Sequence, residues 1–200
     1  FAMSFCFCIL IGSLFVYVKN RTRQYGFFIL ICICVIGYSI YPLIHSFFFL
    51  PVQPWYALEA LSYYLMLPCM ICLEDSIMKK NKGRYLALIL TAWAVAAFFL
   101  EIFAGSISRA EIFYAASWLS EGAKWLAAIY MLSNTFGEIS SVNGKIILAG
   151  TTVYACSLAA DRIWHLYEPI TGGWFPEIGG TILTVAFGCI LGRELAEAYK

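Results

Sequence analysis

Charged residues are scarce in this sequence. Asp, Glu, Lys and Arg make up only 12% of the 200 residues, whereas 62% are hydrophobic. Soluble domains average about 25% charged and roughly 45–50% apolar residues. A soluble fold could not cover this much apolar surface, so the composition excludes that class. The formal net charge of +1 comes from residues dispersed in short connectors, which argues against a nucleic-acid partner.

Three further absences argue against particular kinds of membrane protein. Two histidines are too few for a seven-helix zinc hydrolase similar to ceramidases, whose site needs about three together with an acid. A retinal protein needs a lysine within its last span, and the last apolar stretch has none before Lys200. Pro42 and Pro68 have no counterparts in the fifth to seventh predicted spans, so the internal repeat typical of a small sugar transporter is missing. We expect no catalytic machinery and no cofactor in this segment.

The eight cysteines do not form a metal-binding pattern. Cys6 and Cys8 are two residues apart, as are Cys32 and Cys34, and this spacing places the two side chains on different sides of a helix. A structural zinc site needs four converging ligands. We therefore interpret all eight as small apolar packing residues and predict no metal site.

Long apolar stretches follow one another along the chain, and each approaches the roughly 20 residues that a spanning helix needs. They are continuous rather than alternating, which favours helices over strands. The connectors are too short to form a second domain, so we predict one all-α polytopic membrane bundle over residues 1–200, with seven transmembrane helices. The predicted spans are Phe1–Val18, Tyr25–Leu50, Trp55–Leu73, Tyr85–Phe103, Ile112–Phe136, Ile146–Leu166 and Ile178–Leu191.

Basic residues gather in every second connector, and acidic residues in the others. By the positive-inside rule, the basic ends are cytoplasmic, which predicts an N-terminus outside and a C-terminus in the cytoplasm. The basic ends hold Lys19, Arg21, Arg23, Lys79, Lys80, Lys82, Arg84, Lys145, Arg193 and Lys200. The opposite ends hold Arg109 and Arg162 beside Glu101, Glu111, Asp161, Glu168 and Glu177.

Polar residues inside a span are costly in lipid unless they face the bundle interior and find a partner. Ser117, Glu121, Lys124 and Ala128 fall on one face of the fifth predicted span. The three-residue spacing lets Glu121 and Lys124 neutralise each other near the middle of the membrane. Two interpretations stay open, namely a structural ion pair between helices and a switch element whose partner changes between signalling states.

A second polar group lies where the spans meet the predicted outer surface. It consists of Glu59 in the third span, Asp161, Arg162 and His165 at the end of the sixth, and His45 at the end of the second. Asp161 and His165 are four residues apart and share a helix face. Ordinary interfacial polar residues explain this group, and a metal site would need His45 or another carboxylate to join them.

Aromatic residues are frequent at the same predicted surface. An interfacial belt at the level of the lipid headgroups explains them, and a ligand pocket lined by Trp and Tyr is the alternative. With Trp164 as its candidate aromatic, that pocket would also contain Glu59, His45 and His165. The aromatic residues are Trp55, Tyr56, Trp164, Tyr167, Trp174 and Phe175.

The last span carries small residues four apart, Gly180, Thr184, Gly188 and Gly192. Such a face lets another helix approach closely, either within the bundle or across a homodimer. After Arg193 the chain continues with good helix formers and no stop signal. We expect a continuous helix that leaves the membrane and conveys motion.

Residues 161–169, 173–180 and 192–199 resemble the last two helices of the bacterial seven-transmembrane receptors with diverse intracellular signalling modules. In that family an acidic residue near the end of helix six precedes an outer loop with Gly and Pro, and helix seven ends in a basic residue followed by small and aromatic residues. Asp161, Arg193, Ala196, Ala198 and Tyr199 match this pattern. The seven-helix sensor region ahead of some histidine kinases looks similar.

The resemblance implies a sensor module of the bacterial cytoplasmic membrane. In the family such a module often follows an extracellular ligand-binding domain and precedes a histidine kinase, diguanylate cyclase or phosphatase. Glu121, Lys124, Asp161, Arg162 and Arg193 are then candidates for signal relay. The sequence begins at Phe1 and ends at Lys200 within an expected helix, so we expect a piece of a longer signalling protein with an unknown ligand. A small seven-helix transporter is the alternative function.

Overall fold

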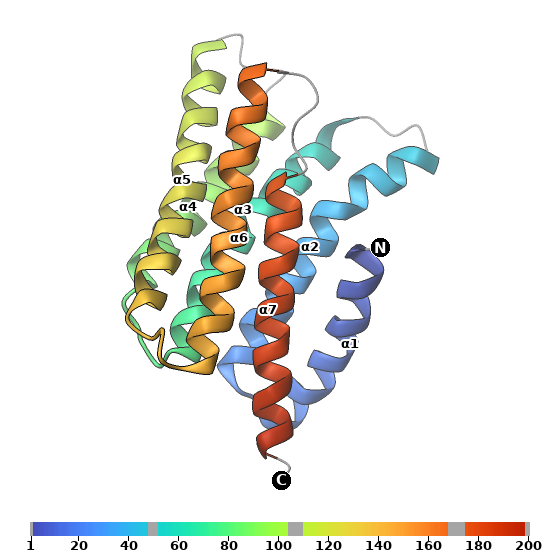
Figure 1. Cartoon of the computed structure of the whole chain (residues 1–200). Coiled ribbons are helices and arrows are strands. Elements are labelled where there is room, and N and C mark those ends of the chain that lie inside the picture. Colours follow the sequence, from blue (N-terminus) through green and yellow to red (C-terminus); the bar gives the residue numbers. More distant parts are fainter. Residues whose placement is uncertain (1, 48–51, 104–109, 168–174, 199–200) are drawn as a thin grey trace.

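The computed structural model describes residues 2–47, 52–103, 110–167 and 175–198. Within these ranges the chain is helical and contains no strand, which confirms the predicted all-α class. Each predicted apolar stretch corresponds to one helix (Figure 1). The helices are α1 (Ala2–Asn20), α2 (Arg23–Phe47), α3 (Val52–Ile77), α4 (Arg84–Ile102), α5 (Ala110–Phe136), α6 (Val142–Tyr167) and α7 (Phe175–Ala198).

Two helices end at a basic residue in the left-handed conformation. Arg21 has φ 48° and its N–H bonds the carbonyl of Tyr17 at 2.7 Å, which closes α1. Lys79 has φ 52°, and the N–H of Lys80 bonds the carbonyl of Asp75 at 2.8 Å, which is the Schellman pattern at the end of α3. The basic connectors therefore begin as helix caps, which lets the chain reverse within a few residues.

The connector before α6 is ordered by a side-chain cap. The Gly144 N–H donates to Ser141 Oγ at 2.9 Å, which satisfies one of the free N–H groups of the first turn. The same hydroxyl donates to the Glu138 carbonyl at 3.0 Å. A Cβ on Gly144 would lie 2.0 Å from that carbonyl oxygen, so this tight approach requires glycine.

Helices adjacent in sequence pack against each other except α4 and α5, and α3 lies between α2 and α4. The bundle is closed by contacts of α7 with α2 and of α5 with α3. Phe28, Leu67, Met70, Tyr154 and Phe187 are among the large side chains fully buried where these helices meet. The α1–α2, α3–α4 and α5–α6 connections lie at the end of the bundle to which α7 runs (Figure 1). We call this end, with its basic connectors, the basic end.

Glycines bring α7 close to its neighbours. A Cβ on Gly179 would lie 3.0 Å from Tyr154 Cα on α6, and one on Gly180 would lie 3.2 Å from Met66 Cε on α3. A Cβ on Gly188 would lie 3.2 Å from Phe28 Cζ on α2. Gly180 and Gly188 therefore pack inside the protein, as one of the two interpretations of the small-residue face predicts.

Gly192 differs from the other glycines of this face. A Cβ at Gly192 would meet no atom within 4 Å, and the residue is exposed. The predicted packing face therefore ends at Gly188 among the described residues, because Gly192 lines a hollow between α1, α2 and α7. Gly192 contributes no close helix contact within the chain.

The surface of the molecule is apolar while part of its interior is polar. Phe15, Val18 and Leu88 are 75%, 73% and 68% exposed, whereas Glu74 and Thr151 are fully buried at 0%. Four helices are long and apolar enough to cross a membrane, over Ala57–Ile77, Arg84–Ile102, Val142–Trp164 and Ile178–Glu197. The described apolar parts of α1 and α2, Phe7–Lys19 and Arg23–Tyr38, are shorter.

Candidate functional site

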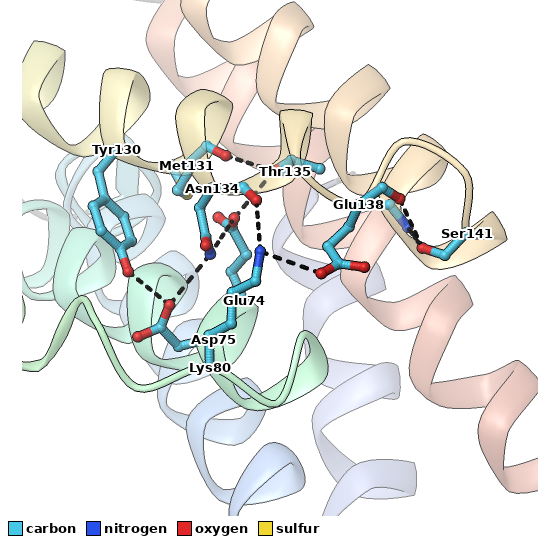
Figure 2. A network of polar contacts seen from close by, with 10 residues as sticks. Glu74, Asp75, Lys80, Tyr130, Met131, Asn134, Thr135, Glu138 and Ser141 are labelled. Atoms are coloured by element: carbon cyan, nitrogen blue, oxygen red, sulfur yellow. Dashed lines mark hydrogen bonds and ion pairs between the residues drawn. The ribbon is translucent and has the colours of Figure 1, made fainter.

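A cluster of polar side chains joins α3 to α5 at the basic end (Figure 2). We define the α3–α5 cluster as Glu74, Asp75, Lys80, Tyr130, Asn134, Thr135 and Glu138. Its two acidic residues on α3, Glu74 and Asp75, lie near the end of this helix, just after its apolar part. α5 packs against α3. Glu74 is 0% and Asp75 5% exposed, so both carboxyl groups must find their partners within the protein.

Asp75 accepts hydrogen bonds from three donors on different parts of the chain. The backbone N–H of Gly83 donates to Oδ2 at 2.7 Å. The Tyr130 hydroxyl and the Asn134 amide donate to Oδ1 at 2.7 and 3.2 Å. Hydrogen bonds to an ionised group are stronger than neutral ones, contributing about 1.5–3 kcal/mol each. The Asp75 carboxylate thereby connects α3, the α3–α4 connector and α5.

Glu74 is satisfied on one oxygen only. The Asn134 amide and the Thr135 hydroxyl both donate to Oε1 at 3.0 Å. Oε2 is buried and has no hydrogen-bond partner within the part of the chain that the structure describes. This oxygen can therefore accept a proton, a water molecule or a cation without displacing an existing bond.

Lys80 brings positive charge to the edge of the cluster. Its Nζ donates to the Asn134 carbonyl at 3.0 Å and lies 3.4 Å from Glu138 Oε1. The left-handed cap at Lys79 turns the chain so that Lys80 reaches back to the end of α5. The α3–α4 and α5–α6 connectors are thus held together at the basic end (Figure 2).

A second polar network holds the C-terminal part of α7, from Leu191 to Glu194, against α2 and α6. The Tyr25 hydroxyl of α2 donates to the Leu191 carbonyl at 3.0 Å in a buried position. Arg193 donates through Nη2 to Asn143 Oδ1 of α6 at 2.6 Å, and the Asn143 amide donates to Glu194 Oε1 at 3.1 Å. Arg193, which the sequence marks as a relay candidate, therefore connects α7 to α6.

The predicted contact between Glu121 and Lys124 is present. Lys124 Nζ lies 2.5 Å from Glu121 Oε1, and the side chains are 13% and 24% exposed respectively. The same ammonium group lies 5.5 Å from the centroid of the Tyr63 ring on α3. The pair thus faces a neighbouring helix rather than the surface.

The outer polar group is only partly brought together. Asp161 is buried at 9% exposure, and Glu59 is half-buried. Arg162 points elsewhere, with its guanidinium carbon 4.6 Å from the centroid of the Trp118 ring on α5. The ring of Trp164 lies 6.1 Å from that of Phe175 on α7. The side chains of His45 and His165 lie outside the described residues.

Metal ligands do not converge in the part of the chain described. There, no three His, Cys, Asp or Glu side chains could hold one ion. The described cysteines are all free thiols; Cys32 and Cys34 are buried, whereas Cys8, Cys156 and Cys189 are exposed. Cys32 and Cys34 therefore pack inside the bundle, whereas Cys8, Cys156 and Cys189 lie on its surface.

The α3–α5 cluster was not predicted from the sequence, although a signal for it exists. Glu74 and Asp75 follow an apolar stretch, and Asn134 and Thr135 close another. The predicted topology places both positions at the same end of the bundle. Two adjacent acids opposite an Asn-Thr pair at one membrane face could therefore have been proposed as partners.

Comparisons with known proteins identify no relative. No family model, no curated protein and no solved structure matches this chain.

The α3–α5 cluster predicts different effects for two isosteric changes. Asp75→Asn replaces an accepting oxygen by an amide that faces a donor, so we expect a loss of about 2–5 kcal/mol in the free energy of unfolding. Glu74→Gln can keep its oxygen toward Asn134 and Thr135, and we expect a loss below about 1.5 kcal/mol. Unfolding in mixed micelles with increasing SDS measures both. Equal losses would contradict the assignment of Asp75 as the central acceptor.

The Glu121–Lys124 contact predicts a coupling energy in a double-mutant cycle. Glu121→Gln or Lys124→Met alone leaves one charge buried without its partner, while the double variant removes both charges. We expect the double variant to lose less stability than the sum of the single losses, by about 0.5–3 kcal/mol. The same unfolding assay measures the cycle. Additive losses would show that the two side chains do not interact.

Proposed function

We propose that this chain is a multi-pass sensor module of the bacterial cytoplasmic membrane. It has seven spans, with the N-terminus outside and the C-terminus in the cytoplasm, and it relays an extracellular or membrane stimulus to an output domain such as a histidine kinase or diguanylate cyclase. The observation that carries the proposal is the position of α7, which packs against α6, α2 and α3 and then leaves the bundle at the basic end (Figure 1).

The distribution of polar and apolar residues supports a membrane environment for the whole bundle. A protein that exposes Phe15 and Leu88 while burying Glu74 and Asp75 would aggregate in water, whereas lipid is compatible with the exposed side chains. The helices with less apolar sequences fit this view, because α5 holds Glu121 and Lys124 as an interior pair. Its polar residues therefore do not prevent it from spanning.

The basic end supports the orientation. Lys19, Lys82, Arg84 and Lys145 are all exposed. They lie in or within one helical turn of connectors that Figure 1 places at the same end as the C-terminus. Short basic connectors are retained on the cytoplasmic side. The end of α7 is therefore available to a cytoplasmic domain.

The contacts of α7 suggest how a stimulus is transmitted. Gly179 and Gly188 allow close approach to α6 and α2, so a small change in the packing of either neighbour bears directly on α7. Tyr25 and Asn143 form hydrogen bonds with the end of α7. Making or breaking these bonds would give α7 a second arrangement. A stimulus needs only to favour one packing over the other. Because Gly180 and Gly188 pack inside the chain, a homodimer would use the exit of α7 from Gly192 onward.

A small transporter is the second candidate, and one observation favours it. Glu74 lies within a candidate span and has a buried oxygen, Oε2, without a partner among the described residues. Buried carboxyl groups of this kind are typical of proton and ion pathways. Uptake assays in proteoliposomes with a proton gradient distinguish this alternative, because a sensor module carries no flux.

The orientation predicts the labelling of two introduced cysteines. In intact cells, a membrane-impermeant thiol reagent should label Gln53→Cys and leave Lys82→Cys unlabelled until the cells are opened. Lys145→Cys should behave as Lys82→Cys does. The parent chain measures the background from native thiols. External labelling of Lys82→Cys would overturn the orientation.

The relay predicts unequal effects at two glycines of α7. In the full gene product, Gly188→Leu presses on Phe28, and overpacking of this size costs about 1–3 kcal/mol, which shifts a two-state equilibrium by about 5- to 150-fold. Gly192→Leu meets open space and should leave output near the parental value. The measurement is the activity of the output domain at equal membrane abundance. Equal effects at both positions would contradict the role of α7 packing.

The reading frame beyond Lys200 tests the proposal most directly. A coiled dimerisation helix followed by a kinase or cyclase domain supports it. A stop codon at this point, or the continuation into a second set of spans, overturns it in favour of the transporter.

If an output domain follows, a Gly-Gly-Gly insertion after Arg193 should uncouple stimulus from output, because it interrupts the rigid helix.

A further inference from the structure

A groove runs along the surface of α2, α3 and α4 near the basic end, with a volume of about 660 Å³. Each helix contributes a stripe at helical spacing, represented by Phe27 and Cys34 on α2, Leu65 on α3, and Arg84 and Thr91 on α4. The groove exists because α2 and α4 both pack on α3 and not closely on each other. Pockets that hold small molecules measure about 300–1,000 Å³, so this volume is sufficient for a ligand.

The walls are apolar except at one end. Leu30, Pro68, Cys69, Ala87 and Leu88 are among the lining residues. Leu30 and Leu88 are 47% and 68% exposed, so the groove opens sideways rather than toward water at the end of the bundle. In the proposed membrane, this opening faces the hydrocarbon of the lipid. An alkyl chain is the ligand that such walls accept.

The depth of the groove corresponds to one leaflet. The stripes span seven residue steps on each helix, from Arg84 to Thr91 on α4 and from Leu65 to Cys72 on α3. At 1.5 Å rise per residue this is about 10 Å. Half of the hydrocarbon core measures about 15 Å. The groove therefore reaches from the basic end into the inner half of the membrane and stops before its centre.

The charged end of the groove selects for an anion. Arg84 is exposed, and no carboxylate pairs with its side chain among the described residues. It is also the first residue of α4, and arginine binds phosphate through a planar fork of donors. Tyr85, 80% exposed beside Arg84, suits the headgroup level.

Taken together, the geometry points to a binding site for one anionic phospholipid of the cytoplasmic leaflet, with an acyl chain in the α2–α3–α4 groove and the headgroup phosphate on Arg84. The inference rests on the proposed membrane placement and does not need the relay. A smaller hollow of about 280 Å³ between α1, α2 and α7 has no charged residue in its lining, so it has nothing to distinguish one headgroup from another.

Native mass spectrometry of the protein from mixed micelles tests the site. With equimolar phosphatidylglycerol and phosphatidylcholine, we expect one tightly retained lipid per protein, with phosphatidylglycerol favoured about fivefold, the effect of one basic residue near the surface. Arg84→Gln should bring this ratio close to one. Leu88→Trp should remove the retained lipid of either kind, because the indole fills the groove.

Two control variants match these changes. Lys145→Gln removes an exposed basic residue at the same end of the bundle but outside the groove, and Leu126→Trp enlarges an exposed side chain of α5. Both should bind lipid as the parent does. Equal retention of the two lipids by the parent, retention by Leu88→Trp, or an equal loss in Lys145→Gln would each overturn the assignment. Because the assay reads neither orientation nor output, a negative result leaves the sensor proposal standing.

Discussion

The carboxylate of Asp75 holds together α3, α4 and α5 at the basic end of the bundle. It accepts hydrogen bonds from Gly83, Tyr130 and Asn134, so one side chain positions the end of α3, the start of α4 and the end of α5. A buried carboxylate is stable only when its oxygens are satisfied. The glycine at position 83 follows from this requirement, because a Cβ there would lie 2.8 Å from the Tyr130 hydroxyl.

The apolar exterior and the polar interior of the bundle have a common physical reason. In the proposed membrane, apolar side chains gain little from burial, and close backbone contacts and internal hydrogen bonds must hold the helices together. Gly179 and Gly188 supply the close contacts of α7, while Tyr25 and Asn143 supply its hydrogen bonds. The same features that stabilise α7 would be rearranged by a stimulus, so stability and the proposed relay share their residues. The lipid groove touches this arrangement through α2 and α3, which also contact α7.

Local features of the site were predictable, whereas for distant segments the sequence indicates at most that they lie at the same end of the bundle. Glu121 and Lys124 pair because three residues on a helix bring side chains together. Glu74 and Asn134 are 60 residues apart, so only the packing of α3 on α5 makes them partners. Arg193 was identified as a relay candidate by its place after the last span, but its bond to Asn143 depends on how α6 lies beside α7. Gly188 and Gly192 look equivalent in the sequence, and they differ because Gly188 lies against Phe28 of α2 whereas Gly192 faces a hollow between α1, α2 and α7.

The sequence by itself determined the class of the fold and the position of all seven helices, because continuous apolar stretches and basic connectors are local properties that lipid and water select directly. The tertiary structure decided which polar groups are satisfied. Asp75 finds three donors, while Glu74 retains an unpartnered oxygen within the described chain. It also decided that α2 and α4 separate over α3 and leave a groove with Arg84 at its end. These outcomes depend on how helices pack side by side, and helical spacing within a single segment carries no information about that.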